Sequence, residues 1–167
     1  MPVIIYRALL AQTKQRASLS TQQSLGETIM DQKDYNRQLI EEFRANRGKS
    51  DGPFAGRPML LLTTTGARSG QSRTTPMMHV HVGNLLLVIA SNVGAPTHPD
   101  WYRNLVAHPE VTVEVGNETY TATAIVTEGA EREQLWNSII EKYPFFTDHQ
   151  AKTTRQIPVI ALERREG

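Results

Sequence analysis

Residues 63–76 read TTTGARSGQSRTTP and bring together side chains that recognise anions. Arg68 and Arg73 carry planar guanidinium groups, whose donors match the oxygens of phosphate and carboxylate groups. Gly66 and Gly70 leave space for backbone N–H groups to approach a ligand closely, and the Ser and Thr hydroxyls supply further donors. Gly, Ser and charged residues are also typical of ordinary surface turns. An anion-binding loop and a solvated turn are therefore both consistent with this stretch alone.

The loop matches neither of two common phosphate-binding motifs. A P-loop needs Lys followed by Ser or Thr after its glycines, and a dinucleotide-binding fingerprint needs a third glycine before a helix. Here the glycines are followed by the extended pattern MMHVHV of residues 77–82. Any anion at this loop must be held in a different way.

Length and composition limit the remaining possibilities. The 167 residues fit one domain with a real core, and the absence of Cys excludes disulfides, thiolate nucleophiles and Cys-based metal sites. The 18 basic and 17 acidic residues leave a net charge of only +1, so no overall field attracts nucleic acid or an acidic membrane. We therefore expect a cytoplasmic protein that does not bind nucleic acid and whose anion recognition is local.

The N-terminal segment needs a separate interpretation. Residues 1–11 are apolar, but they are too short to span a bilayer and lack the preceding basic region of a signal peptide. Residues 12–32 are polar and rich in Gln, Ser and Thr. We expect residues 1–32 to be a flexible leader. The alternative is an amphipathic segment that contacts a partner or the surface of a membrane.

The rest of the chain predicts one α+β domain over residues 33–167. Apolar residues at helical spacing, β-branched runs and turn residues between them indicate the elements. The expected helices cover 34–46, a short segment that begins at Pro99 or Asp100, and 130–143; the expected strands cover 58–65, 71–82, 84–91, 110–127 with a turn at Gly116 and Asn117, and 157–163. Because the connections between strands are short, the sheet should be antiparallel. We expect a small antiparallel barrel with helices packed outside it.

A second stretch with functional character is ASNVGAPTHPDW at residues 90–101. It leaves a predicted strand through a Ser/Asn/Gly turn and enters a helix that begins with Trp101 and Tyr102. An exit of this kind, with aromatic residues at the helix start, is a common way to build the wall of a pocket.

Several ordered segments together resemble a known family, the deazaflavin-dependent nitroreductases of actinobacteria. The similarity runs from about residue 35 to the C-terminus. The segments are LLLTTTG at 60–66 with Arg68, Ser69, Gly70, Arg73 and Pro76; Ala90, Ser91 and Asn92 with Gly94 and Ala95; Pro99 with Trp101, Tyr102, Asn104 and Leu105; and His108 and Pro109 with Val111 and Val113. The resemblance implies a split β-barrel that binds reduced coenzyme F420, a flavin analogue with a phosphate and an oligoglutamate tail. It also implies hydride transfer from this cofactor to an organic acceptor.

The resemblance further implies which residues contact the cofactor. Arg68 and Arg73 would hold its anionic tail. The remaining implied contacts are Ala67, Ser69, Thr74, Thr75, Pro76, Met77, Met78 and His79 along the phosphate and ring edge, Ala90, Ser91 and Asn92 at the ring, and Trp101, Tyr102, Arg103 and Asn104 on the far side. In the competing interpretation Trp101 is a core residue, and Met77 and Met78 only fill a strand.

Hydride transfer requires the protein to position the reactants and to stabilise the developing charge, and it requires no nucleophile. Ser91 is the candidate to donate a hydrogen bond to the acceptor oxygen as that oxygen gains charge, and Tyr143 would support the substrate side. Met78, Phe146 and His149 stand where the resemblance to the prodrug-reducing member of the family would place an aromatic residue and tyrosines. We therefore expect a quinone or another planar carbonyl compound as the acceptor, with nitro compounds reduced less well.

Other interpretations remain open at this point. A non-catalytic protein that stores or shields the deazaflavin would keep the arginines but would need no acceptor pocket beside Ser91. A weaker alternative is a flavin mononucleotide oxidase of the related split-barrel type. His79 and His81 would share one face of a strand, but no carboxylate motif lies near them, so we predict no metal site.

Overall fold

The computed structural model describes residues 32–48 and 58–165. The expectations for residues 1–31 lie outside this part of the chain. No helix within the described part is long and apolar enough to cross a membrane.

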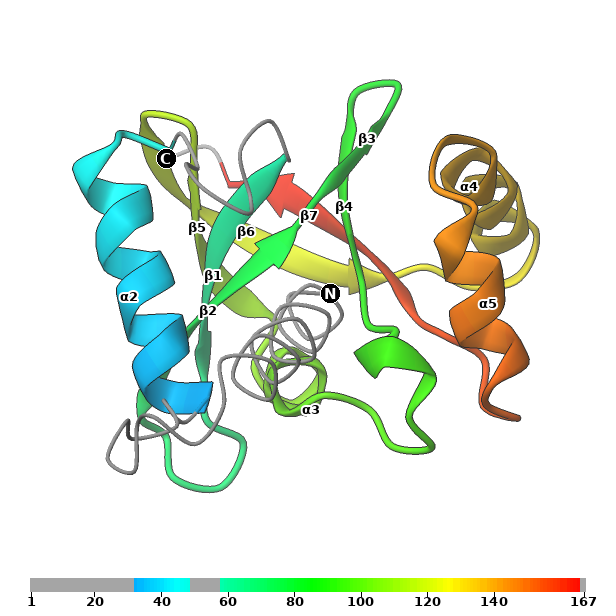
Figure 1. The fold of residues 1–167 in the computed structure, drawn as a ribbon, viewed down its shortest axis with the longest axis horizontal. Helices are drawn as coiled ribbons and strands as arrows, with labels where there is room; N and C mark the ends of the chain where they lie inside the picture. The colour runs from blue at the N-terminus through cyan, green and yellow to red at the C-terminus, as the bar shows by residue number, and fades with distance from the viewer. Residues whose placement is uncertain (1–31, 49–57, 166–167) are drawn as a thin grey trace, which may run out of the picture.

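A single curled sheet of seven strands forms the centre of the fold (Figure 1). Its spatial order is β2 (Ser72–Met78), β1 (Met59–Thr65), β5 (Glu110–Val115), β6 (Glu118–Val126), β7 (Val159–Arg164), β4 (Leu85–Ile89) and β3 (Val80–Val82). Every neighbouring pair is antiparallel. The expected antiparallel barrel and the turn at Gly116 and Asn117 are thereby confirmed.

The two ends of this sheet are joined by a single residue, His79. Strand β2 pairs with β1 through Met59 and Met78, whereas β3 pairs with β4 through Val80 and Leu87. The backbone N–H of His79 itself donates to the carbonyl oxygen of Pro58 at 2.8 Å. The expectation of one continuous strand over 71–82 is therefore wrong at His79, because the chain passes there from one edge of the curled sheet to the other.

Both faces of β1 are buried, which explains why it reads as a continuous apolar run. Leu61 belongs to one core cluster with Phe43 of helix α2 (Gln32–Ala45), and Leu60 belongs to a second cluster with Trp101 of helix α3 (Asp100–Ala107). The side chains of a strand alternate between its faces, so neighbouring residues enter different clusters. Met77 and Met78 are divided between the two clusters in the same way.

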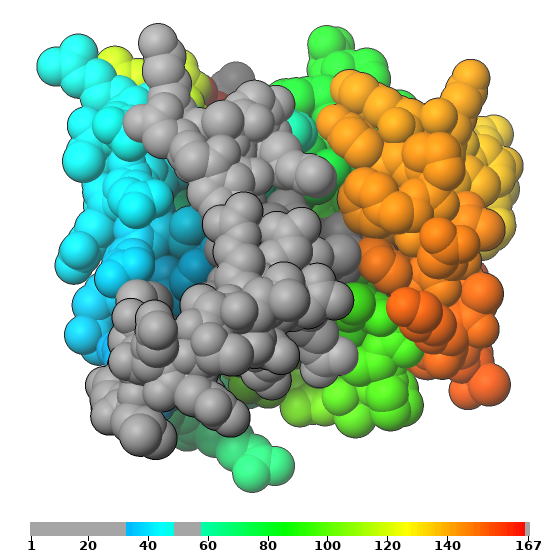
Figure 2. Space-filling view, viewed as in Figure 1, coloured from blue at the N-terminus to red at the C-terminus, as the bar shows by residue number. Residues whose placement is uncertain are grey.

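Helices enclose the sheet on several sides. Helix α2 lies on one flank, and α4 (Gly129–Lys142) and α5 (Phe145–Ala151) lie on the opposite flank (Figures 1 and 2). Helices α2, α3 and α4 match the predicted segments within a few residues. Helix α5 and the short 3-10 helix η2 (Asn92–Gly94) were not predicted. Tyr143 consequently lies between two helices and not after the last one.

Candidate functional site

The loop between β1 and β2 is a tight turn closed by its own backbone. The N–H of Gly66 donates to the carbonyl oxygen of Gln71 at 2.7 Å, and the N–H of Gly70 donates to that of Gly66 at 2.9 Å. Gly70 has a φ of +71°, a conformation that glycine adopts without strain. A Cβ atom on Gly66 would lie 2.5 Å from Oγ of Ser69. The loop therefore favours glycine at position 70, whereas a Cβ atom at position 66 would require the exposed Ser69 side chain to move.

Asn104 ties this loop to helix α3. Its Oδ1 accepts a hydrogen bond from the backbone N–H of Ala67 at 3.0 Å, and its Nδ2 donates to Oγ1 of Thr64 at 3.2 Å. The side chain is buried, with 9% exposure. Asn104 thus contacts two residues that lie 37 and 40 positions before it in the sequence.

The two arginines of the loop point to solvent. Arg68, Ser69 and Arg73 are exposed, and Nη2 of Arg73 makes a long bond of 3.4 Å to Oε1 of Gln71. Neither arginine forms an ion pair with a carboxylate in the described part of the chain. Beside them, the hydroxyls of Thr63 and Thr74 are hydrogen-bonded at 2.8 Å. The loop therefore presents guanidinium groups that no carboxylate of the described residues compensates, and such groups fit an anionic ligand.

The second predicted stretch forms an irregular turn after β4. Ala90 and Ser91 are completely buried. Asn92 and Val93 have φ angles of +46° and +60°, which are unusual for residues other than glycine and unfavourable for a β-branched side chain. Nδ2 of Asn92 donates to the carbonyl oxygen of Thr97 at 2.9 Å. This turn is strained, and strain of this kind is concentrated at functional sites.

Gly94 of the same turn packs directly against helix α5. A Cβ atom at this position would lie 2.6 Å from the carbonyl oxygen of His149. Its φ of +78° also favours glycine. The turn that carries Ser91 is therefore fitted against the helix that carries Phe146 and His149.

Arg155, which the sequence analysis did not identify, contacts this turn at four points. Its Nε donates to the carbonyl oxygen of Ala95 at 3.0 Å, and its Nη2 donates to that of Ser91 at 2.7 Å. Its Nη1 lies 3.2 Å from the carbonyl oxygen of Ala90 and 3.0 Å from Nδ1 of His98. Burial lowers the pKa of the Arg155 guanidinium from its ordinary value, but arginine remains protonated.

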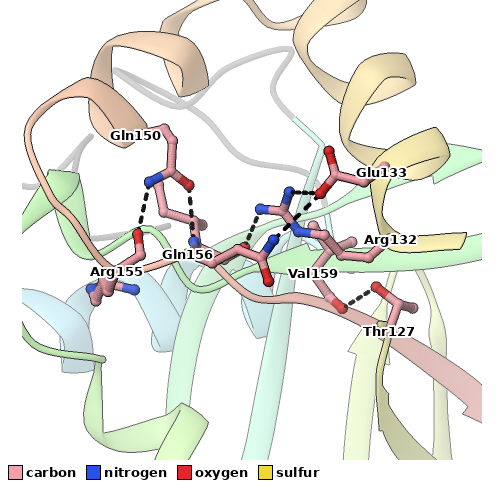
Figure 3. Close-up of polar contacts among 8 residues, drawn as sticks. Thr127, Arg132, Glu133, Gln150, Arg155, Gln156 and Val159 are labelled. Atoms are coloured by element: carbon pink, nitrogen blue, oxygen red, sulfur yellow. Dashed lines mark hydrogen bonds and ion pairs between the residues drawn. The ribbon is translucent and has the colours of Figure 1, made fainter. Parts of the chain in front are cut away.

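The segment around Arg155 is itself held by side chains from α4, from α5 and from the residues before α4 (Figure 3). Gln150 donates to the carbonyl oxygen of Arg155 at 2.7 Å and accepts from the N–H of Ile157 at 3.0 Å. Arg132 donates to the carbonyl oxygen of Ile157 at 2.6 Å. Thr127 donates to the carbonyl oxygen of Val159 at 2.8 Å, at the start of β7.

The start of α3 places aromatic residues beside the turn. Trp101 is 4% exposed and packs in the cluster that contains Met77 and Ala90. Its Nε1 is buried and has no hydrogen-bond acceptor among the described residues. The burial of Trp101 is also what the competing core interpretation expects. Arg103 is exposed and lies 3.4 Å from Asp100.

His98 and Tyr102 connect α3 to Arg155. Their ring centroids are 4.5 Å apart. Burial raises the pKa of Tyr102, and burial followed by the charges of Arg155 and Arg103 lowers the pKa of His98. A neutral His98 can accept the hydrogen bond from Arg155 at Nδ1.

The predicted substrate-side residues form an aromatic cluster in the other core. Phe146 is completely buried, and its ring centroid lies 6.5 Å from that of Tyr143 and 5.9 Å from that of His149. Met78 is 1% exposed and belongs to the same core cluster as Phe146. Nδ1 of His149 is buried without a partner in the described part of the chain, and burial lowers the pKa of this residue to about 4. Tyr143 is half-buried at the end of α4.

The predicted residues are thus divided between the two sides of the sheet. Ala90, Trp101 and Met77 share one core cluster, and Met78 and Phe146 share the other. Contact between the Ser91 turn and α5 joins the two groups. Thr75 is half-buried and Pro76 is buried on β2, and as neighbours on a strand they lie on opposite faces of the sheet.

A cavity of about 460 Å³ lies elsewhere, at the start of β5 and the end of β1. Its lining residues are Thr63, Thr65, Ser72, Ala107, His108, Pro109, Glu110, Val111 and Thr112. None of these residues was among the predicted site residues. The cavity is open and polar, and it does not include Ser91 or the aromatic cluster.

His79 and His81 do not share an environment. His79 is buried and His81 is exposed, with their ring centroids 5.1 Å apart. Burial, followed by the nearby charges of His81 and Lys142, lowers the pKa of His79 to about 4. Within residues 32–48 and 58–165, no group of three His, Asp or Glu side chains is arranged to hold a metal ion.

Solved structures with similar folds agree with this geometry. An F420-H2 dependent reductase (FDR-A) is 44% identical, with a TM-score of 0.58, over 64% of this chain and 95% of that chain. A structure described as a domain-swapped dimer is 39% identical, with a TM-score of 0.60, over 80% of this chain and 100% of that chain. The heme storage protein HutZ of Vibrio cholerae, at 18% identity and a TM-score of 0.51, shares the fold alone.

Curated sequences and a family profile give the same result. The F420H(2)-dependent quinone reductase Rv1261c of Mycobacterium tuberculosis is 36% identical over 127 residues, which are 74% of this chain and 85% of that protein. The profile of the F420H(2)-dependent quinone reductases matches residues 35–164. The resemblance inferred from the motifs is confirmed, and so are the oxidoreductase class and reduced coenzyme F420 as its cofactor. The chain belongs to the F420H(2)-dependent quinone reductase family.

Proposed function

We propose that this chain reduces a quinone with reduced F420, and that residues 66–73 and 90–92 form two parts of its cofactor site. The observation that carries the proposal is the Asn104 bridge. Asn104 fixes the loop of Arg68 to the helix that carries Trp101, through the 3.0 Å bond to Ala67. A cofactor with an anionic tail and a planar ring needs cations and an apolar wall in one fixed arrangement.

The residues present fit the anionic part of this cofactor. Arg68 and Arg73 are exposed and have no carboxylate partner among the described residues, so their donors are available to phosphodiester and carboxylate oxygens. A Cβ atom on Gly70 would meet no atom within 4 Å, so the backbone there is open to approach. Ala67, Ser69, Thr74 and Thr75 supply the remaining polar contacts in the proposal.

The ring would be held by residues of the second part of the site. Ala90, Ser91 and Asn92 form one side of it, and Trp101, Tyr102 and Arg103 form the other. The buried Nε1 of Trp101, which has no acceptor in the described part of the chain, is a donor suited to a ring carbonyl. Met77, which shares a core cluster with Ala90 and Trp101, adds to this wall from β2, and Pro76, Met78 and His79 are assigned to the site as its neighbours along the chain.

The hydride comes from reduced F420 when it is bound, and the quinone takes up this hydride and one proton to become a hydroquinone. The protein has to align the acceptor and stabilise the charge that develops on its oxygen. We assign the donor of that hydrogen bond to Ser91. Tyr143, Phe146 and His149 are assigned to the acceptor side, together with Met78.

A purely cofactor-storing protein would need no such donor. The match to a family of quinone reductases favours the enzyme. The two functions differ in a simple assay, because only the enzyme oxidises reduced F420 faster when a soluble quinone such as menadione is added.

The role of Ser91 is tested with Ser91→Ala and a matched control, Ser138→Ala, on the exposed side of α4. Loss of one donor to a developing oxyanion costs about 100-fold in kcat. We expect a loss of this order for Ser91→Ala, an F420 dissociation constant within about threefold of the wild type, and no change in the control. Equal kcat values for the two variants would show that Ser91 does not act on the acceptor.

A further inference from the structure

We propose that Arg155 is a positioning residue for the reaction, which holds residues 90–98 in the conformation that presents Ser91 and Asn92 to the cofactor and the acceptor. This inference rests on the proposed function of Ser91. It adds a residue that lies 57 to 65 positions away in the sequence and outside the motifs shared with the family.

The contacts of Arg155 are all directed at one segment. Its guanidinium donates to the carbonyl oxygens of Ala90, Ser91 and Ala95 and reaches Nδ1 of His98. The acceptors lie before and after η2. A planar fork with donors in fixed directions can satisfy several carbonyl groups at once, whereas a lysine ammonium offers one nitrogen. Arg155 therefore sets the relative positions of the two ends of the turn.

The turn needs such support because its backbone is strained. Asn92 and Val93 adopt positive φ angles of +46° and +60°. Conformations of this kind persist only where the surrounding structure over-determines them. Arg155 supplies three of the backbone contacts that do so, and the close packing of Gly94 on His149 supplies another.

Arg155 has no carboxylate partner in the described part of the chain. Among the described residues, its guanidinium contacts carbonyl oxygens and the ring of His98. An arginine that served only in an ion pair would contact a carboxylate instead. The charge of Arg155 also lies next to Ser91, where the proposed function places a developing negative charge.

The anchoring of Arg155 connects the turn to the predicted acceptor side. Gln150 holds the backbone of Arg155, and it follows His149 directly on α5. Arg155 thus joins the Ser91 turn to the helix that carries Phe146 and His149. A change in the position of one group would be transmitted to the other through these bonds.

The test compares Arg155→Met and Arg155→Lys with the control Arg164→Met. Arg164 is an exposed arginine at the end of β7 that contacts Glu118 and the ring of Tyr120, and it has no described bond to residues 90–98 or to the segment around Arg155. Displacement of a reacting group by about 1 Å can lower a rate about 100-fold. For Arg155→Met we expect a loss of kcat of this order with menadione, and an F420 dissociation constant within about threefold of the wild type. Arg164→Met should leave kcat unchanged, because the contacts that it removes are those with Glu118 and Tyr120.

Arg155→Lys keeps the positive charge, and it allows the test to be made even if Arg155→Met does not fold. We expect it to melt near the wild type but to recover only part of kcat, because it cannot bind all three carbonyl groups. A wild-type kcat in folded Arg155→Lys, or in Arg155→Met, would overturn the inference. An equal loss of kcat in Arg164→Met would also overturn it, since that loss would not depend on contacts with residues 90–98.

A double-mutant cycle separates this inference from the proposed function. If Arg155 acts through Ser91, adding Ser91→Ala to Arg155→Met should lower kcat by less than about threefold further. If the loss of kcat in the double variant equals the product of the two single losses, Arg155 does not act through Ser91. If Ser91→Ala alone has no effect while Arg155→Met is slow, the proposed role of Ser91 is wrong and Arg155 positions other residues of the turn. If Ser91→Ala is slow and Arg155→Met is not, only the role of Arg155 is wrong.

Discussion

The backbone N–H of Ala67 donates to Oδ1 of Asn104 at 3.0 Å, and this bond fixes the arginine-bearing loop to helix α3. The same side chain donates to Thr64 on β1. Asn104 therefore connects the strand before the loop, the loop itself and the helix that carries Trp101. The relationship explains why these motifs occur together, because each depends on the position of the others.

Replacing Asn104 with alanine should loosen the loop and weaken cofactor binding. A net hydrogen bond contributes about 1 kcal/mol, and the loss leaves Thr64 without this partner. We expect F420 affinity to fall about fivefold and the melting temperature to decrease. Fluorescence titration measures the affinity, with Asn137→Ala on the exposed side of α4 as the control. Unchanged affinity in Asn104→Ala would mean that the bridge does not organise the cofactor site.

The exposed arginines of the loop should account for the salt dependence of binding. Hydrogen bonds to charged groups contribute about 1.5–3 kcal/mol, so Arg68→Ala should weaken F420 binding by about 10- to 150-fold. Arg73→Ala should act in the same direction. Added salt should weaken wild-type binding more than that of either variant. Arg37→Ala, at an exposed position of α2, serves as the control. If the F420 affinity of the wild type does not change with salt, the loop is an ordinary surface turn and its arginines do not bind the cofactor.

Stability should fall in acid because of His79 and His149. Burial lowers the pKa of both to about 4, whereas the unfolded value is about 6.5. The unfolded state therefore binds more protons between these values, and protonation favours unfolding. The free energy of unfolding should have its full value above about pH 6.5 and should decrease as the pH falls towards about 4.

Urea unfolding across this pH range measures the effect. His79→Gln should remove part of the slope, with an upper limit of about 1.4 kcal/mol for each pH unit. A wild-type unfolding free energy that is constant from about pH 6.5 to about pH 4.5 would show that neither histidine is kept neutral by burial.

Acceptor preference should respond to the aromatic cluster around Phe146. We expect the wild type to reduce a quinone faster than a nitroimidazole, because Met78, Phe146 and His149 present no tyrosine hydroxyl to a nitro group. Phe146→Tyr adds one hydroxyl and should shift the ratio of kcat/KM towards the nitroimidazole, with F420 affinity within about threefold. Since Phe146 is completely buried, an unpartnered hydroxyl should also lower stability by about 1–3 kcal/mol. A wild type that already prefers the nitroimidazole, or an unchanged ratio in the variant, would place the acceptor elsewhere.

The sequence predicted those parts of the fold that depend on local patterns. Helix α2 and the β5–β6 hairpin followed from apolar spacing and from a Gly-Asn turn. The loop of Arg68 followed from its residue types, and the resemblance added its partners. Helix α5 was missed because it has only seven residues, although Phe145, Phe146 and His149 have helical spacing. That spacing was the available signal.

The remaining features depend on contacts that no local pattern records. The passage between sheet edges at His79 follows from the curl of the whole sheet, and MMHVHV reads as one strand without it. Arg155 lies in the polar stretch TTRQ, which is typical of a loop, and its acceptors are 57 to 65 positions away. Its role is visible only when the chain is folded.

The central claim is that this chain transfers a hydride from reduced F420 to a quinone. The most direct measurement is the rate at which purified protein oxidises reduced F420 with menadione, followed by the absorbance of the oxidised deazaflavin, beside the rate with NADPH as the donor. We predict rapid turnover with reduced F420 and little with NADPH, since residues 63–82 contain no dinucleotide fingerprint. Turnover with NADPH in the absence of deazaflavin, or no quinone-dependent oxidation of reduced F420, would contradict the account.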